Sequence, residues 1–272
     1  MEPLIIGNWK LNPKSSKEAI NTFKAIKKGL QKDSKAVICS PTLYIPELSK
    51  LISKNISIGA QDAFEVDLGA YTGKISAFIL KQYKVSYCLV GHSEMRASGD
   101  TDEIISQKLR SVLKQGITPI LCVGEKERTE EHWYLHVVKE QILKAFEGFT
   151  SSEIKKVVIA YEPIWAIGKD AVRSSTPSEC EEMTIFIRRV VADIVGEKIA
   201  HDIKVLYGGS VDKANAQSFM DIQGVTGLLI GRVSLSPKDF IGIINNAYDK
   251  LKEKNKQYAN TQKNQRKTNI KK

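Results

Sequence analysis

A carboxylate at the end of an apolar run is the first chemical feature of this sequence. The run Val157–Tyr161 has the length and apolar character of a buried strand, and Glu162 follows it directly. Pro163 fixes its own φ and disfavours the helical conformation for Glu162. Trp165 and Ile167 come next. An acid beside apolar side chains that could cover it is typical of a proton acceptor shielded from water.

Two further reactive side chains follow other apolar runs. Lys10 comes after Leu4–Asn8, and His92 comes after Tyr87–Val90. Alone, such a lysine is usually a surface residue, such a histidine a packed or capping residue, and such a glutamate a salt-bridge partner. Together the three suit proton transfer: Glu162 takes a proton from carbon, His92 polarises a carbonyl oxygen, and Lys10 stabilises the enediolate charge. Nucleophilic hydrolysis is disfavoured because no Ser or Cys with a paired His is evident.

Glycines after the last two apolar runs predict an anion site. Gly208, Gly209 and Ser210 follow the seventh run, and Gly231 and Arg232 follow the eighth. Glycine lets backbone N–H groups approach an anion closely, and phosphate is the usual ligand of such turns. The alternative is an ordinary tight turn, which we favour less because the feature occurs at both runs.

These residues require a fold that brings strand ends together. The expected strands are Leu4–Asn8, Ala36–Cys39, Ile56–Gly59, Tyr87–Val90, Thr118–Val123, Val157–Tyr161, Lys204–Tyr207 and Gly227–Ile230. The expected helices are Ser16–Leu30, Tyr44–Lys50, Ile75–Tyr83, Asp102–Gln115, Trp133–Phe146, Pro177–Val195, Lys213–Met220 and Pro237–Leu251. Strands that alternate with helices predict a parallel sheet, and eight units favour a closed (β/α)₈ TIM barrel over an open doubly wound sheet.

Positive charge is concentrated near the C-terminal end. The 272-residue chain has a net charge of +10, and residues 250–272 hold eight lysines and one arginine against Glu253. No linker rich in Gly, Pro or Ser divides the remainder. We therefore expect one catalytic domain over residues 1–249, and a basic tail over residues 250–272 that completes the last helix and is then disordered. Nucleic-acid binding by this tail is less favoured than a solvated tail, because no aromatic platform or recognition motif accompanies it.

The sequence indicates a cytoplasmic protein that binds neither membrane nor metal. No apolar run reaches the roughly 18 residues of a membrane span, and the first residues lack signal-peptide character. His132 and His136 are four apart on an expected helix, but no third metal ligand is obvious. Scattered cysteines without a C-x-x-C pair are typical of buried thiols in a reducing compartment. They are Cys39, Cys88, Cys122 and Cys180.

Seven segments in a fixed order resemble the triosephosphate isomerase family. They are Gly7–Lys10, Gly59–Gln61, Gly69–Gly73, Gly91–Glu94, Leu121–Glu125, Ala160–Gly168 and Tyr207–Val211. The likeness runs from Pro3 to about Asn246, and an ordered set of motifs is far more specific than any single one. The resemblance implies that a homodimer interconverts dihydroxyacetone phosphate and glyceraldehyde 3-phosphate in glycolysis and gluconeogenesis, without cofactor or metal.

The resemblance also implies roles for individual residues. Glu162 is expected to be the catalytic base and His92 the electrophile. Asn8 and Lys10 are expected to bind the substrate, with Lys10 stabilising charge. The remaining positions are Gly168, Ser210 and Gly231 for phosphate binding through backbone N–H groups, Glu94 and Cys122 as supports near the catalytic residues, and Gln61 and Thr72 in the loop that docks into a partner subunit.

The chain departs from the family pattern in three places. Lys169–Arg173 replaces the usual Thr-Gly-Lys-x-Ala of the active-site lid. Arg232 stands where the family has a second glycine after strand eight, so we expect it to bind the phosphate or to pair with the lid residue Asp170. Met95 and Lys74 replace a common Arg and Glu, which puts the salt bridges at the dimer rim in doubt.

Two alternative functions remain open. A barrel isomerase for another small sugar phosphate would follow if Lys169–Arg173 and Arg232 widen or recharge the site. A degenerate barrel that acts as an interaction module through its basic tail is the other alternative. The intact set of Lys10, His92 and Glu162 argues against that module.

Overall fold

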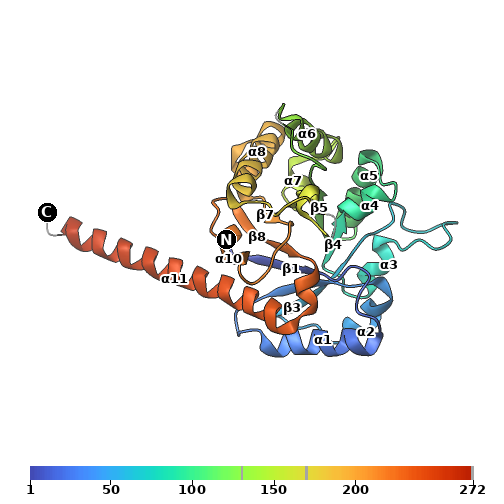
Figure 1. The fold of residues 1–272 in the computed structure, drawn as a ribbon, viewed down its shortest axis with the longest axis horizontal. Coiled ribbons are helices and arrows are strands. Elements are labelled where there is room, and N and C mark those ends of the chain that lie inside the picture. Colours follow the sequence, from blue (N-terminus) through green and yellow to red (C-terminus); the bar gives the residue numbers. More distant parts are fainter. Residues whose placement is uncertain (130, 169–170, 271–272) are drawn as a thin grey trace.

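Eight parallel strands form a closed barrel in chain order, with helices around it (Figure 1). The structure, a computed structural model, describes residues 1–129, 131–168 and 171–270, with the backbone alone for residues 255 and 258–270. The strands are β1 (Leu4–Asn8), β2 (Ala36–Cys39), β3 (Ile56–Ala60), β4 (Tyr87–Val90), β5 (Thr118–Val123), β6 (Val158–Tyr161), β7 (Val205–Tyr207) and β8 (Val225–Ile230). Since β8 pairs with β1, the predicted (β/α)₈ barrel is confirmed.

The strands are largely buried on both faces, which explains why they appear in the sequence as mainly apolar runs. Successive side chains of a strand point to opposite sides of the sheet. In β1, Leu4 and Ile6 belong to the cluster that fills the barrel, whereas Ile5 belongs to the larger cluster shared with the helices. Packing on both faces holds the strand ends rigidly, so the side chains that follow them have defined positions.

Helices surround the barrel, and several of them begin at a side-chain cap. They are α1 (Ser16–Gly29), α2 (Ile45–Leu48), α3 (Ala77–Gln82), α4 (Ser93–Ala97), α5 (Asp102–Lys114), α6 (Trp133–Ala145), α7 (Ser151–Ile154), α8 (Pro177–Val195), α9 (Glu197–Asp202), α10 (Ala216–Met220) and α11 (Pro237–Ile270), with single turns η1 (Thr42–Tyr44), η2 (Ile164–Ala166) and η3 (Arg232–Leu235). At α8, Thr176 and Glu179 form a capping box, in which each side chain accepts a backbone N–H of the other residue. The sequence did not predict α4, α7 and α9, which are too short to show a helical repeat.

The last helix is longer than predicted. We expected it to end near Leu251, but α11 continues as a helix through Ile270 and extends away from the barrel (Figure 1). The physical reason is composition: after Leu251 this segment has no Gly or Pro and is rich in Lys and Gln, which favour helix. Neither α11 nor any other helix among the described residues is long and apolar enough to cross a membrane. The domain boundary at residue 249 stays a prediction.

Candidate functional site

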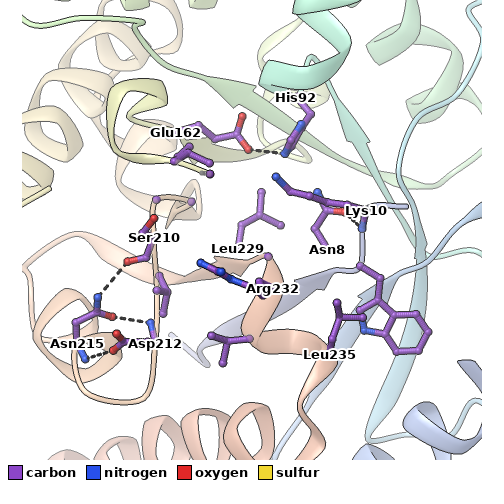
Figure 2. A pocket seen from close by; sticks show the side chains of 18 of the residues that line it. Asn8, Lys10, His92, Glu162, Ser210, Asp212, Asn215, Leu229, Arg232 and Leu235 are labelled. Atoms are coloured by element: carbon purple, nitrogen blue, oxygen red, sulfur yellow. Dashed lines mark hydrogen bonds and ion pairs between the residues drawn. The ribbon is translucent and has the colours of Figure 1, made fainter. Parts of the chain in front are cut away.

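A cavity of about 440 Å³ opens where the strands of the barrel end (Figure 2). Its wall includes every residue that we predicted to react or to bind substrate: Asn8, Lys10, His92, Glu162, Gly168, Ser210, Gly231 and Arg232. These residues follow five different strands, and the closed barrel brings them together on one face. The four predicted supporting residues, Glu94, Cys122, Gln61 and Thr72, lie outside the wall of this cavity.

Glu162 is buried directly after β6 and held by two groups. It is 3 % exposed. Its Oε1 lies 3.2 Å from Nε2 of His92, and its Oε2 accepts a hydrogen bond from the backbone N–H of Ser93 at 3.0 Å. Its own N–H donates to the carbonyl oxygen of Val123 at 2.8 Å. The carboxylate is therefore little solvated and fixed in orientation, as a positioned general base requires.

His92 follows β4 and caps the N-terminus of α4. Its Nδ1 accepts a hydrogen bond from the backbone N–H of Glu94 at 3.2 Å. A ring nitrogen that accepts a hydrogen bond carries no proton, so the neutral ring has its proton on Nε2. Nε2 can therefore donate to Glu162 or to a substrate oxygen. The bond from the Glu94 N–H thus leaves Nε2, which faces Glu162, as the donor atom of the ring.

Lys10 has a backbone conformation that is uncommon for a residue with a side chain. Its φ is 52°, in the left-handed region. Oδ1 of Asn8 accepts the Lys10 N–H at 3.0 Å, and Nε2 of Gln61 donates to the Lys10 carbonyl oxygen at 2.8 Å. These two side chains stabilise the turn that carries the ammonium group. The sequence predicted Gln61 only as a residue of the dimer loop and gave no sign of this bond.

The Lys10 ammonium is paired with Glu94. Its Nζ lies 2.7 Å from Oε1 of Glu94. Partial burial opposes ionisation of this carboxyl, but the hydrogen bond and charge of Lys10 outweigh burial and hold the pKa of Glu94 below its ordinary value. Glu94 is thus an ionised partner of the ammonium.

A glycine beneath Glu162 permits the close approach of two loops. Gly124 is held by Gln141, which accepts its N–H at 2.8 Å and donates to its carbonyl oxygen at 3.0 Å. A Cβ at Gly124 would overlap the carbonyl oxygen of Glu162, so only glycine fits.

The thiol of Cys122 is also close to Glu162. Burial and, to a smaller extent, the charge of Glu162 raise the pKa of this thiol. Cys122 is therefore a neutral, fully buried group, and its supporting role stays a prediction.

Glu125 anchors the apolar half of the lid, which includes η2. It is 1 % exposed, and its Oε1 accepts hydrogen bonds from Nε1 of Trp165 and from the hydroxyl of Tyr161, both at 2.8 Å. Nε of Arg128 donates to the same oxygen at 3.3 Å. Burial and the Glu125 charge raise the pKa of Tyr161, so its hydroxyl stays protonated and donates. We did not predict this role for Glu125, although the motif Leu121–Glu125 ends on it.

Arg173 fixes the other end of the lid. Its guanidinium pairs with both carboxylate oxygens of Glu179, one at 3.0 Å, and its central carbon lies 4.4 Å from the centroid of a Trp165 ring. The hydrogen bond from Arg173, against burial and with help from Thr176, lowers the pKa of Glu179 to about 2. The unusual second half of the lid therefore has an anchor of its own. Val172 adds a backbone bond from its N–H to the Trp165 carbonyl oxygen at 2.8 Å.

Backbone N–H groups line the end of the cavity where the sequence predicts an anion site. Within the described residues, the backbone N–H groups of Gly168, Ser210 and Gly231 have no protein acceptor. Gly168 has φ of 80°, a conformation that favours glycine. Oγ of Ser210 donates to the carbonyl oxygen of Ala166 at 2.7 Å and so joins the loop after β7 to the lid. The three N–H groups can donate to a phosphate.

Arg232 lies at the rim of the cavity. It is exposed, and its side chain extends into the cavity (Figure 2). It forms no hydrogen bond or ion pair with any residue that the structure describes. Lys169 and Asp170 lie outside the described residues, so the pairing of Asp170 with Arg232 stays a hypothesis.

The segment between β3 and α3 projects from the barrel (Figure 1). It exposes apolar side chains, with Leu68 at 66 % and Tyr71 at 47 %. Tyr71 packs against Phe64 with ring centroids 4.9 Å apart, and the exposed Thr72 follows it. Apolar side chains on a projecting loop are typical of a protein–protein contact.

The cavity combines a base, a neutral donor, a cation and free N–H groups. A buried carboxylate can take a proton from carbon, and a donor beside it can bond the oxygen on which charge develops. An ammonium stabilises that charge, and the N–H groups hold an anionic substituent. This arrangement suits proton transfer within a small phosphorylated carbonyl compound.

Comparison with known proteins gives a consistent result. A sequence model of the triosephosphate isomerase family matches residues 3–247. The chain is 39% identical over 248 residues to the triosephosphate isomerase of Alkaliphilus oremlandii (strain OhILAs), which covers 90% of this chain and 99% of that protein. It is also 39% identical over 252 residues to the triosephosphate isomerase of Lactobacillus delbrueckii subsp. bulgaricus, covering 89% of this chain and 97% of that protein.

Proposed function

The chain belongs to the triosephosphate isomerase family, and on this premise we propose that Glu162, His92 and Lys10 catalyse its reaction. The enzyme interconverts dihydroxyacetone phosphate and D-glyceraldehyde 3-phosphate, a step of glycolysis. Substrate and product are isomers, so the chemistry consists of proton transfers alone.

We assign one role to each of these residues. Glu162 takes a proton from the carbon next to the carbonyl group, and the electron pair moves to the carbonyl oxygen. Nε2 of His92 donates to that oxygen and then shuttles a proton between the two oxygens of the enediolate. Lys10 stabilises the negative charge, and Glu162 returns its proton to the neighbouring carbon. The lid that Trp165 anchors excludes water from the enediolate.

The phosphate is held by the free N–H groups of Gly168, Ser210 and Gly231. Each lies on a different loop, so the anion joins the lid to the loops after β7 and β8. Asn8 binds substrate beside Lys10 and keeps the Lys10 turn in place. Binding of the phosphate therefore also orders the residues around the reacting carbons.

One observation supports this assignment above the others: Nε2 of His92 lies 3.2 Å from Oε1 of Glu162, and both side chains are buried in the wall of the cavity that holds Lys10. The test is a coupled assay on D-glyceraldehyde 3-phosphate with the wild type, Glu162→Gln and the matched control Glu181→Gln. Loss of the base should lower kcat by about 10²- to 10⁴-fold, and the exposed Glu181 should be replaceable without effect. Near-normal turnover by Glu162→Gln would refute the mechanism, and faster turnover of a tetrose or pentose phosphate would favour the rival substrate class.

We also propose a homodimer formed through the segment between β3 and α3. The exposed Leu68 and Tyr71 support this, as does the bond from Gln61 at the base of the loop to the Lys10 carbonyl. Docking of the loop would thus influence the ammonium. Sedimentation of the wild type and of Tyr71→Asp at several concentrations tests it, and a wild type that stays monomeric at all of them would disprove the dimer.

We infer a cytoplasmic location from the cysteines, which are all free and buried. Buried thiols persist in a reducing compartment. Cell fractionation with an antibody to the barrel tests the location.

The basic segment 250–272 is a separate unit of the chain in this proposal, and we assign it no nucleic-acid partner.

A further inference from the structure

Arg232 is a charged group in the cavity that the proton-transfer chemistry does not use. It is the first residue of η3, directly after Gly231. Among the residues that the structure describes, the cavity wall contains two carboxylates, and both are engaged elsewhere: Glu162 is bound to His92, and Oδ1 of Asp212 accepts two backbone N–H groups of its own turn at 2.8 and 2.9 Å. Arg232 pairs with neither of them, nor with any other described residue.

No residue that the structure describes balances the charge of Arg232. Lys10, the other strong cation of the wall, is neutralised by Glu94 at 2.7 Å. Among the described residues of the wall, the guanidinium of Arg232 is the cation without an anionic partner. An anion that enters the cavity meets this charge together with the free N–H of Gly231, one residue earlier in the chain.

A guanidinium recognises phosphate differently from a backbone donor. Its planar fork can donate two parallel hydrogen bonds to two phosphate oxygens, and its full charge favours the dianion over the monoanion. The family pattern has glycine at this position, which can offer a backbone N–H alone. Resting on the proposed function, we propose that the guanidinium of Arg232 is a direct ligand of the substrate phosphate.

The experiment compares phosphate binding by two variants that each remove one exposed arginine. Arg232→Ala removes the guanidinium from the cavity, and Arg189→Ala removes one from the surface of α8, so both change the net charge equally. Inorganic phosphate is titrated into each protein by calorimetry at low ionic strength. Kinetics are measured on D-glyceraldehyde 3-phosphate and on D-glyceraldehyde, which lacks the phosphate.

In Arg232→Ala, the Kd for inorganic phosphate and the KM for D-glyceraldehyde 3-phosphate should rise by about tenfold or more, the loss expected for a charge-assisted hydrogen bond. The kcat/KM for D-glyceraldehyde should stay within about twofold, and Arg232→Lys should recover part of the affinity. Arg189→Ala should match the wild type in every assay.

Three results would overturn the proposal: an unchanged Kd for phosphate in Arg232→Ala, an equal loss in Arg189→Ala, or an equal loss of turnover on D-glyceraldehyde. A wild type that does not turn over D-glyceraldehyde 3-phosphate would instead disprove the proposed function. The phosphate titration would still decide the role of Arg232 in that case.

Discussion

Nζ of Lys10 lies 2.7 Å from Oε1 of Glu94, so a single ion pair joins the end of β1 to the first turn of α4. The two side chains are 30% and 60% exposed, and exposed pairs of this kind contribute only about 0–1 kcal/mol to stability. The pair therefore matters for where the ammonium lies and little for whether the barrel folds.

Glu94→Gln should lower kcat/KM by roughly tenfold, because small displacements of a catalytic group cost that much or more. Its free energy of unfolding should change by less than about 0.5 kcal/mol. Glu2→Gln is the matched control. It breaks the exposed ion pair between Glu2 and Lys35, which also has an N–O distance of 2.7 Å and lies outside the cavity wall. Equal kinetics for the two variants would show that Glu94 does not position Lys10.

Gly124→Ala should destabilise the barrel and impair the base. The added Cβ meets the carbonyl oxygen of Glu162, and relief of the overlap must move one of the two loops. We expect a loss of about 1–3 kcal/mol in urea unfolding and a fall in kcat. Gly242→Ala is the control. Gly242 lies within helix α11, and the nearest atom to a Cβ there is Cε of Lys213 at 3.8 Å, so this variant should be neutral or up to about 1 kcal/mol more stable. Equal stability of the two variants would contradict the close approach at Gly124.

Arg173→Ala should change the pH dependence of stability. The folded pKa of Glu179, about 2, is depressed below the ordinary value of 4.5. A depressed carboxyl pKa adds stability that is complete above about pH 4.5 and disappears as the pH falls toward 2. Without Arg173, NMR titration should show the pKa of Glu179 rising toward its ordinary value, and the unfolding free energy should fall less steeply below pH 4.5. Thr176 still caps the helix in the variant, so an unchanged titration would mean that the cap alone holds the carboxylate.

Deletion of residues 258–272 should leave turnover and the thermal midpoint unchanged. The family match ends at residue 247, and the shortened chain retains contacts of α11 with the barrel, such as Lys252 with Asp33 at 3.5 Å. Deletion from Tyr248 onward is the contrasting variant. It removes a buried ring whose hydroxyl donates to the Pro3 carbonyl oxygen at 3.1 Å, and should cost about 3 kcal/mol or more. If the shorter deletion also lowered the midpoint, the basic segment would belong to the barrel.

The strand ends were predictable because the strands are buried on both faces. Each appears as a continuous apolar run, so its last residue is clear, and Lys10, His92 and Glu162 could be placed on one face of the barrel. Observed strand limits differ from the predicted ones by no more than two residues. The capping box at Thr176 was equally clear, because its residues are local in sequence.

The supports of the site could not be predicted in the same way. The bonds from Gln61 to Lys10 and from Trp165 to Glu125 join residues that are 51 and 40 positions apart. The contact of Ser93 with Glu162 uses a backbone N–H, which has no sequence signature. The length of α11 was underestimated because its polar composition suits a solvated helix as well as a disordered tail.

At Lys10, the backbone conformation that suits protein stability best would require glycine, whereas the proposed reaction requires a lysine side chain. A side chain in this conformation costs about 1–2 kcal/mol relative to glycine. Lys10→Gly would therefore relieve the backbone strain while removing the ammonium to which we assign charge stabilisation. Selection for thermal stability alone would favour glycine here, so a lysine at φ of 52° marks a site where turnover has outweighed robustness.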